Sequence, residues 1–273
     1  MADMILVEPF ALTLAGAAGP PMAVSPGYYV NDSAGVGTGA ANLVTNDPRE
    51  VWQSTAGGTV LYLWIDLGAD RLWDTLVLNN TNFDPASTMN LYYGTSAQAN
   101  YFATLALNGL MARAPSEDVA STNGPAAIWL PTAINARYIF LGVYQALGSP
   151  QISIGNLLVG KSWKPVLGRE FGSGRPPIDS GARERLSDGG LATLSGKLIS
   201  GFKWVFGDLD APDLAKLWGI LRRRRTTEPM LLIEDPGAAV AEGIHYGTFV
   251  SLEAYERNDV TKSRWVVNFE DWL

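Results

Sequence analysis

The first part of the chain alternates short apolar runs with turn-forming residues. Between residues 59 and 159 the runs lie at 61–68, 75–80, 89–94, 102–107, 126–131, 137–144 and 152–160. Several alternate with period two, so that Leu61, Leu63 and Ile65 share one face of the first run. The intervening segments are rich in Asn, Asp, Pro, Ser and Gly, which favour turns. Many short strands without a helical pattern predict a β-sandwich or jelly roll.

The last part of the chain predicts further strands. Residues 198–209 alternate, with Phe202, Trp204 and Phe206 on one face. Later apolar runs at 229–236, 245–258 and 263–273 also predict strands, the last two as an antiparallel pair. The fold class expected for the whole chain is therefore mainly β, a sandwich followed by a second β-rich domain.

One amphipathic helix is expected at 211–225. Asp210 is a suitable N-cap, Pro212 lies in the first turn, and Asp213 complements the positive end of the helix dipole. Arg222, Arg223, Arg224 and Arg225 end the segment, where cations are favourable. The apolar face predicted from the spacing i, i+3, i+4, i+7 consists of Leu214, Leu217, Trp218 and Leu221.

Charge divides the chain near Gly160. Residues 1–160 hold four basic and eleven acidic residues, whereas residues 161–273 hold sixteen of each. We therefore expect a lead-in strand at 1–32 that joins the C-terminal domain, a sandwich at 33–160, an extended arm at 161–190 rich in Gly, Pro and Arg, and a β-domain at 191–273. The arm has too few apolar residues to bury itself, so it is expected to pack on a neighbour.

Composition excludes several classes of function. Without cysteine there is no disulfide or thiolate site, and a catalytic triad would have to use His245, the single histidine. A glycan-degrading enzyme needs two carboxylates facing one cleft, and the spacing of Asp66, Asp74 and Asp84 does not predict this. The sequence has no basic stripe of the kind that binds nucleic acids. It also contains no segment with the pattern expected of a signal peptide or a membrane span. We expect no enzymatic activity.

The segment ANLVTNDPREVWQS followed by LWIDLG resembles the start of discoidin-like, galactose-binding-like jelly rolls, and the resemblance extends over about 28–160. It implies that Trp52 buries beside the first strand and pins the polar loop that precedes it. It also suggests Asp47 as a calcium ligand. Against a calcium site, Gly155 and Asn156 stand where this family tends to have a carboxylate. No other cofactor is expected.

Family members that bind glycans use loops at one end of the sandwich. The matching loops here offer amides, a carboxylate and aromatic rings, the groups that take sugar hydroxyls and stack on sugar rings. The alternative is that these are ordinary turn residues, chosen for their backbone preferences. The candidate glycan-binding residues are Asn79, Asn82, Phe83, Asp84, Tyr144 and Gln145.

Residues 161–273 resemble the distal tail and baseplate proteins of long-tailed bacteriophages, on the segments KWVFGDLDAPDLAKLW, EPMLLIEDP and HYGTF and a terminal strand ending in Glu-Asp-Trp. This resemblance implies a ring of identical copies in the virion tail tip, bound to tail tube and tip hub proteins. Arginine is enriched where proteins bind one another. The candidate interface residues are Arg169, Arg175, Arg183, Arg185, Arg222, Arg223, Arg224 and Arg225.

Two functions remain open at this point. The first is a structural tail-tip protein, made in the host cytoplasm and located in the virion, whose jelly roll contacts a host surface polysaccharide. The second is a stand-alone carbohydrate-binding module or lectin without a role in assembly. The first function predicts oligomers, whereas the second predicts a monomer that binds glycan.

Overall fold

The structure of the protein, a computed structural model, describes residues 4–14, 27–32, 37–56, 60–83, 87–98, 107–108, 124–145, 150–168, 170–196, 198–236 and 243–272. Internal contacts divide the chain into two compact units. We call one the sandwich unit; it comprises Ile5–Trp163 and Leu231–Ile244. The other, which we call the helix unit, comprises Met1–Met4, Lys164–Met230 and His245–Leu273.

The sandwich unit consists of antiparallel strands and two short 3-10 helices. The strands within it follow the spatial order β14-β1-β9-β4-β7-β5-β6, with β2 paired to β4 and β3 paired to β8. The lead-in strand β1 thus pairs with β9 and β14. The elements are β1 (Ile5–Pro9), β2 (Gly27–Asp32), η1 (Ala40–Val44), β3 (Trp52–Gln53), β4 (Val60–Thr81), β5 (Thr88–Gly94), η2 (Ser96–Gln98), β6 (Leu107–Asn108), β7 (Gly124–Tyr144), β8 (Ser153–Ile154), β9 (Asn156–Trp163) and β14 (Met230–Ile233).

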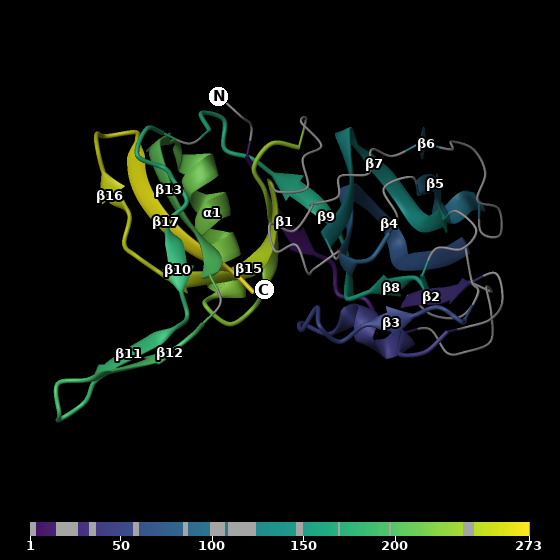
Figure 1. Cartoon of the computed structure of the whole chain (residues 1–273). Helices are drawn as coiled ribbons and strands as arrows, with labels where there is room; N and C mark the ends of the chain where they lie inside the picture. Colours follow the sequence, from purple (N-terminus) through teal and green to yellow (C-terminus); the bar gives the residue numbers. More distant parts are fainter. Residues whose placement is uncertain are drawn as a thin grey trace. The chain divides into compact units, whose positions relative to one another are not determined.

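Strands β4 and β7 are each longer than the sequence predicts. The runs at 61–68 and 75–80 form one strand, and so do the runs at 126–131 and 137–144. The pairing of β4 with β7 shifts register between Asp66 and Arg71, so residues 67–70 form a bulge within the strand rather than a turn between two strands. Both strands therefore cross from one layer to the other (Figure 1).

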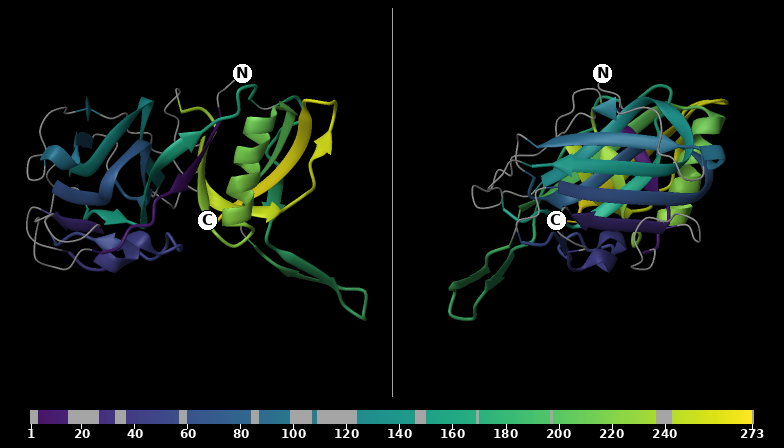
Figure 2. Two further views of the ribbon diagram at one scale, coloured as in Figure 1. Left: turned by 180° about the vertical axis from the view of Figure 1, so that it is seen from behind. Right: turned by 90° about the vertical axis from the view of Figure 1, so that its right-hand side faces the viewer.

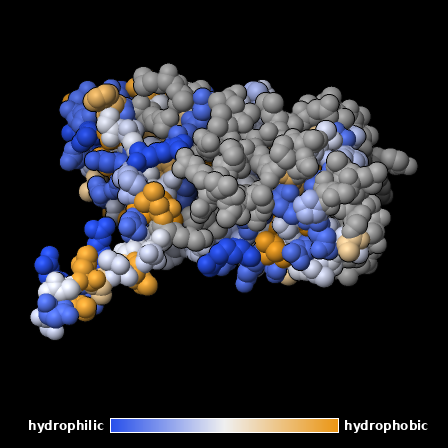
Figure 3. Space-filling model, viewed as in Figure 1, coloured by the Kyte–Doolittle hydropathy of each residue, from blue (hydrophilic) through white to orange (hydrophobic). Residues whose placement is uncertain are grey.

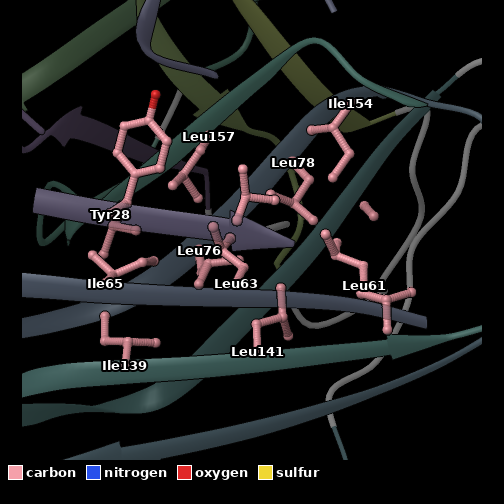
Figure 4. Close-up of a cluster of buried hydrophobic side chains, with 14 of the residues drawn as sticks. Tyr28, Leu61, Leu63, Ile65, Leu76, Leu78, Ile139, Leu141, Ile154 and Leu157 are labelled. Atoms are coloured by element: carbon pink, nitrogen blue, oxygen red, sulfur yellow. The ribbon is translucent and has the colours of Figure 1, made fainter. Parts of the chain in front are cut away.

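The two layers enclose one hydrophobic core. Leu61, Leu63 and Ile65 come from the first half of β4, and Leu76 and Leu78 come from its second half. All five belong to a single buried cluster. Figure 4 shows these side chains converging with those of Ile139, Leu141 and Leu157. Because side chains alternate along a strand, the residues between them face outward from each layer. The predicted β-sandwich is confirmed.

The helix unit consists of antiparallel strands with one helix among its described residues. Its strands follow the order β10-β13-β17-β15, and β16 pairs with β17. Helix α1 packs on one face of this sheet (Figure 2). The predicted strand at 198–209 is confirmed as β13. The elements are β10 (Pro177–Asp179), β11 (Ala182–Arg185), β12 (Leu191–Leu194), β13 (Leu198–Leu209), α1 (Ala211–Arg224), β15 (Ile244–Ser251), β16 (Glu256–Arg257) and β17 (Ser263–Asp271).

Helix α1 begins as the sequence predicts, but its buried face differs. The Asp210 carboxylate accepts a hydrogen bond from the backbone N–H of Asp213 at 2.9 Å, which is the expected N-cap. The fully buried apolar residues are Leu217, Ile220 and Leu221. Trp218 was predicted on this face, yet it remains 46% exposed. It lies at the margin of the face, where its ring is 5.5 Å from that of Trp265.

The described residues include no helix that is both long and apolar enough to cross a membrane.

Candidate functional site

Three of the predicted glycan-binding residues are buried in the sandwich unit or hydrogen-bonded to its backbone. The Asn82 side chain donates to the carbonyl of Gln151 at 2.6 Å and accepts from the N–H of Ser153 at 2.8 Å. Phe83 is fully buried in the core cluster. Asn79 is also buried, on β4 opposite Asn156 of β9. Phe83 therefore has no ring face open to a sugar. The side-chain amide of Asn82 already forms hydrogen bonds with backbone groups.

Of the remaining three, Tyr144 alone is described at the surface. It is half-buried at the end of β7, and its ring lies over Gly142, where an added Cβ would be 3.1 Å from the Tyr144 hydroxyl. Gln145 is buried. Asp84 lies outside the described residues. Among the described members of the set, Asn82 and Tyr144 are half-buried, and the other three are buried.

Asp47 is engaged by a neighbouring cation. The Arg49 guanidinium donates to both carboxylate oxygens, at 2.8 Å from Nε to Oδ1 and 2.6 Å from Nη2 to Oδ2. These hydrogen bonds lower the pKa of Asp47 to about 2. A bound calcium ion would have to displace Arg49. Within the described residues no group of three or more His, Asp and Glu side chains could hold a metal ion.

The carboxylates considered for catalysis make structural contacts. Asp66 pairs with Arg137 at 2.7 Å, and it also accepts a hydrogen bond from the N–H of Gly68. Asp74 accepts from the backbone N–H of Ser162 at 2.7 Å and from its hydroxyl at 2.8 Å, which ties β4 to β9. Two carboxylates held in this way are not available to flank one glycosidic bond.

The single histidine is held by a carboxylate. His245 Nδ1 lies 3.1 Å from Asp271 Oδ2, and its ring is 4.2 Å from the ring of Phe202. A catalytic triad would use the second nitrogen to activate a nucleophile. That nitrogen, Nε2, is buried and has no hydrogen-bond partner in the described part of the chain.

The predicted interface arginines occupy three places on the helix unit. Arg183 and Arg185 are exposed on β11. Arg175 lies over the ring of Phe202, with its guanidinium carbon 5.6 Å from the ring centroid. Arg222, Arg223 and Arg224 form the last turn of α1, and Arg225 caps it. Arg169 lies outside the described residues.

Strands β11 and β12 form a hairpin that projects from the sheet of the helix unit (Figure 1). Every residue of the two strands is exposed. The segment predicted as an arm at 161–190 is thus partly hairpin, and its pairing extends to Leu194. Leu186, Leu191 and Leu194 are 47%, 60% and 71% exposed. Apolar side chains are visible on this projection in Figure 3.

A row of aromatic residues that the sequence alone did not predict lies on the outer face of the sandwich unit. Tyr29 of β2 is the register partner of Trp64 of β4, which is opposite Phe140 of β7, which is opposite Tyr92 of β5. All four are half-buried. The available signal was the period-two placement of aromatic residues at the outward positions of each strand. Their alignment into one row depends on strand order.

Comparisons with known proteins find similarity in solved structures. No protein-family model matches the sequence, and no curated protein is significantly similar to it. Chitosan-binding module 1 of a chitosanase/glucanase from Paenibacillus sp. IK-5 matches 51% of this chain and 98% of its own, at 16% identity and a TM-score of 0.35.

Two further structures match a similar share of the chain. The lectin domain of lectinolysin, complexed with Lewis B antigen, matches 53% of this chain and 99% of its own, at 15% identity and a TM-score of 0.34. The family 32 carbohydrate-binding module from C. perfringens NanJ, in complex with galactose, matches 48% of this chain and 90% of its own, at 15% identity and a TM-score of 0.32.

Proposed function

We propose that the protein is a non-catalytic structural component of a bacteriophage tail tip or baseplate ring. In this proposal the helix unit assembles with further copies of the chain and with neighbouring tail tube and tip hub proteins. The sandwich unit contacts a polysaccharide of the host surface. The protein would then be located in the virion after synthesis in the host cytoplasm.

The observation that carries this proposal is the exposed β11–β12 hairpin. An isolated two-stranded hairpin is at best marginally stable in water, because it has no core to offset the entropy of ordering its chain. Here Leu191 and Leu194 lie on opposite faces of the hairpin, since Leu191 pairs with Arg185 and Leu194 pairs with Ala182. Burial of both leucines therefore requires a partner that covers both faces.

The arginines support a protein partner. On one face of the hairpin Arg183 and Arg185 stand beside Leu191, a mixture of guanidinium groups and apolar surface that is typical of protein interfaces. At the end of α1, Arg222 and Arg223 complement the negative end of the helix dipole, so their clustering does not require a phosphate ligand.

The proposal is tested by replacing Leu191 and Leu194 together with Asp. The matched control is Val260→Asp, which adds a charge at another exposed apolar position of the same unit. We expect the wild-type protein and the control to form oligomers by light scattering and ring-shaped particles by electron microscopy. The double variant should stay a folded monomer.

A wild-type protein that remains monomeric with purified tail proteins present, and still binds polysaccharide, would contradict the ring role. It would support the stand-alone carbohydrate-binding module instead. Normal assembly of the double variant would show that the hairpin is not the interface.

A further inference from the structure

We propose that the outer face of the layer formed by β2, β4, β7 and β5 binds an uncharged polysaccharide chain, on a platform made by the aromatic row. This inference rests on the glycan contact proposed for the sandwich unit, and it places that contact on the sheet face rather than in the end loops. The residues that carry it are Tyr29, Tyr62, Trp64, Tyr92, Phe140 and Tyr144.

Ring contacts join three neighbouring strands, β4, β7 and β5, and Tyr29 of β2 lies next to Trp64 in the register. The ring centroids of Trp64 and Phe140 are 4.1 Å apart, and those of Tyr92 and Phe140 are 5.7 Å apart. Tyr62, in the next cross-strand position, is 6.0 Å from Phe140 with an interplanar angle of 16°. The first two pairs are tilted, with interplanar angles of 45° and 42°. Adjacent rings on neighbouring strands thus present apolar surface on which the C–H faces of successive sugar rings can stack.

These aromatic residues face away from the core. Leu63 and Leu141, the inward neighbours of Trp64 and Phe140 along their strands, are fully buried in the cluster between the layers. Alternation along a strand then places Trp64 and Phe140 on the outer face. A group of large, partly exposed rings is unusual on a protein surface and marks a binding site.

Polar groups lie beside the rings. In the row next to the aromatic row, Tyr62 is opposite Gly142, which in turn is opposite Asn90. Gly142 has no side chain, and the ring of Tyr144 lies over it. The Asn90 amide and the tyrosine hydroxyls supply donors and acceptors of the kind that sugar hydroxyls need.

The charge on this face decides the class of ligand. The described side chains of the aromatic row and of the row beside it carry no charge. At one end of the face Asp66 and Arg137 neutralise one another through two hydrogen bonds, of 2.7 Å and 2.9 Å. Without cations to pair with phosphate or carboxylate groups, the face suits a neutral glycan better than a nucleic acid or an acidic polysaccharide.

The test is affinity electrophoresis of the full chain through native gels that contain soluble neutral polysaccharides, with alginate as the anionic comparison. An array of bacterial surface polysaccharides widens the set of neutral glycans. The variants are Trp64→Leu, Phe140→Leu and the double variant, since leucine keeps apolar volume on the strand while removing the ring. Trp272→Leu is the matched control, because Trp272 is a partly exposed aromatic residue of the other unit.

We expect at least one neutral polysaccharide to retard the wild-type protein. Each single variant should weaken the affinity about tenfold, the scale of one lost aromatic contact. The double variant should lose retardation, while Trp272→Leu and the loop variant Asp84→Ala behave as wild type. In the wild-type protein the indole N–H resonance of Trp64 should shift on addition of the polysaccharide, a measurement that does not depend on a variant folding.

Three results would overturn the inference. Binding that persists in the double variant and is lost in Asp84→Ala would place the site in the loops and leave the proposed function intact. A double variant with a changed oligomeric state would show that the face binds a second copy of the chain. If no neutral polysaccharide binds, the glycan contact proposed for the sandwich unit is wrong. The assembly role is still decided separately by the Leu191 and Leu194 variants.

Discussion

Gly37 lies directly against the indole of Trp52. A Cβ atom on Gly37 would come within 2.8 Å of Trp52 Nε1 and 2.3 Å of the Gln53 carbonyl oxygen. Gly37 also has a φ of +68°, in the left-handed region that side chains disfavour. The polar segment before β3 is thus held against a buried tryptophan by a residue that cannot carry a side chain.

We expect Gly37→Ala to destabilise the sandwich unit by more than the left-handed backbone alone explains. Gly168→Ala is the matched control, because its φ is +56° and an added Cβ would meet nothing within 4 Å. The control isolates the backbone strain, about 1–2 kcal/mol. Urea unfolding curves give both values, and equal losses would show that the contact with Trp52 does not constrain position 37.

Trp52→Ala should lower the free energy of unfolding by about 3–5 kcal/mol, because it removes a large side chain from a packed core. Trp52 is fully buried and lies opposite Ile154 in the β3–β8 pair, so its structural role predicted from the sequence is confirmed. Trp272→Ala, at a partly exposed position, serves as the comparison. Denaturant unfolding monitored by circular dichroism measures both, and a loss for Trp52→Ala no larger than that for Trp272→Ala would contradict the prediction.

Asp74→Ala should cost about 1–3 kcal/mol of stability, because it leaves the part-buried N–H and hydroxyl of Ser162 without their acceptor. Ser162→Ala removes the hydroxyl while keeping the N–H. A double-mutant cycle of the two changes should therefore give a coupling energy of about 0.5–3 kcal/mol. Additive losses within error would mean that this link between β4 and β9 carries no net energy.

The pair of Asp47 and Arg49 predicts a pH dependence. The Asp47 pKa is lowered to about 2, from about 3.9 in an unfolded chain. A lowered pKa contributes stability above pH 4, and this contribution is lost as the pH falls from about 4 to about 2. Since Arg49 is largely exposed, solvent screening keeps this contribution small.

Carbon-13 NMR of the Asp47 carboxyl group measures that pKa directly. Arg49→Ala should raise the pKa part of the way toward 3.9, because it removes the guanidinium hydrogen bonds and the nearby positive charge but keeps the hydrogen bond from the backbone N–H of residue 49. Arg71→Ala changes the same charge elsewhere in the unit and should leave the titration unchanged. An unchanged pKa in Arg49→Ala would show that the ion pair does not persist in solution.

The sequence by itself determined the features that depend on near neighbours in the chain. The alternation of Leu61, Leu63 and Ile65 predicted the buried side of β4, and the same reasoning predicted Phe202, Trp204 and Phe206 in β13. The helix cap at Asp210 followed from local chemistry. Period and capping act over a few residues, so one sequence suffices to read them.

Only the tertiary structure decided which residues from distant strands meet. Asn82 and Phe83 have the composition of a polar loop, yet long-range contacts with Gln151, Ser153 and the core turn them inward. The aromatic row joins residues 29, 64, 92 and 140, which become neighbours through strand pairing. Alternation fixes the face of a strand on which a residue lies, whereas strand order and register, set by the packing of the whole core, fix its neighbours across the sheet.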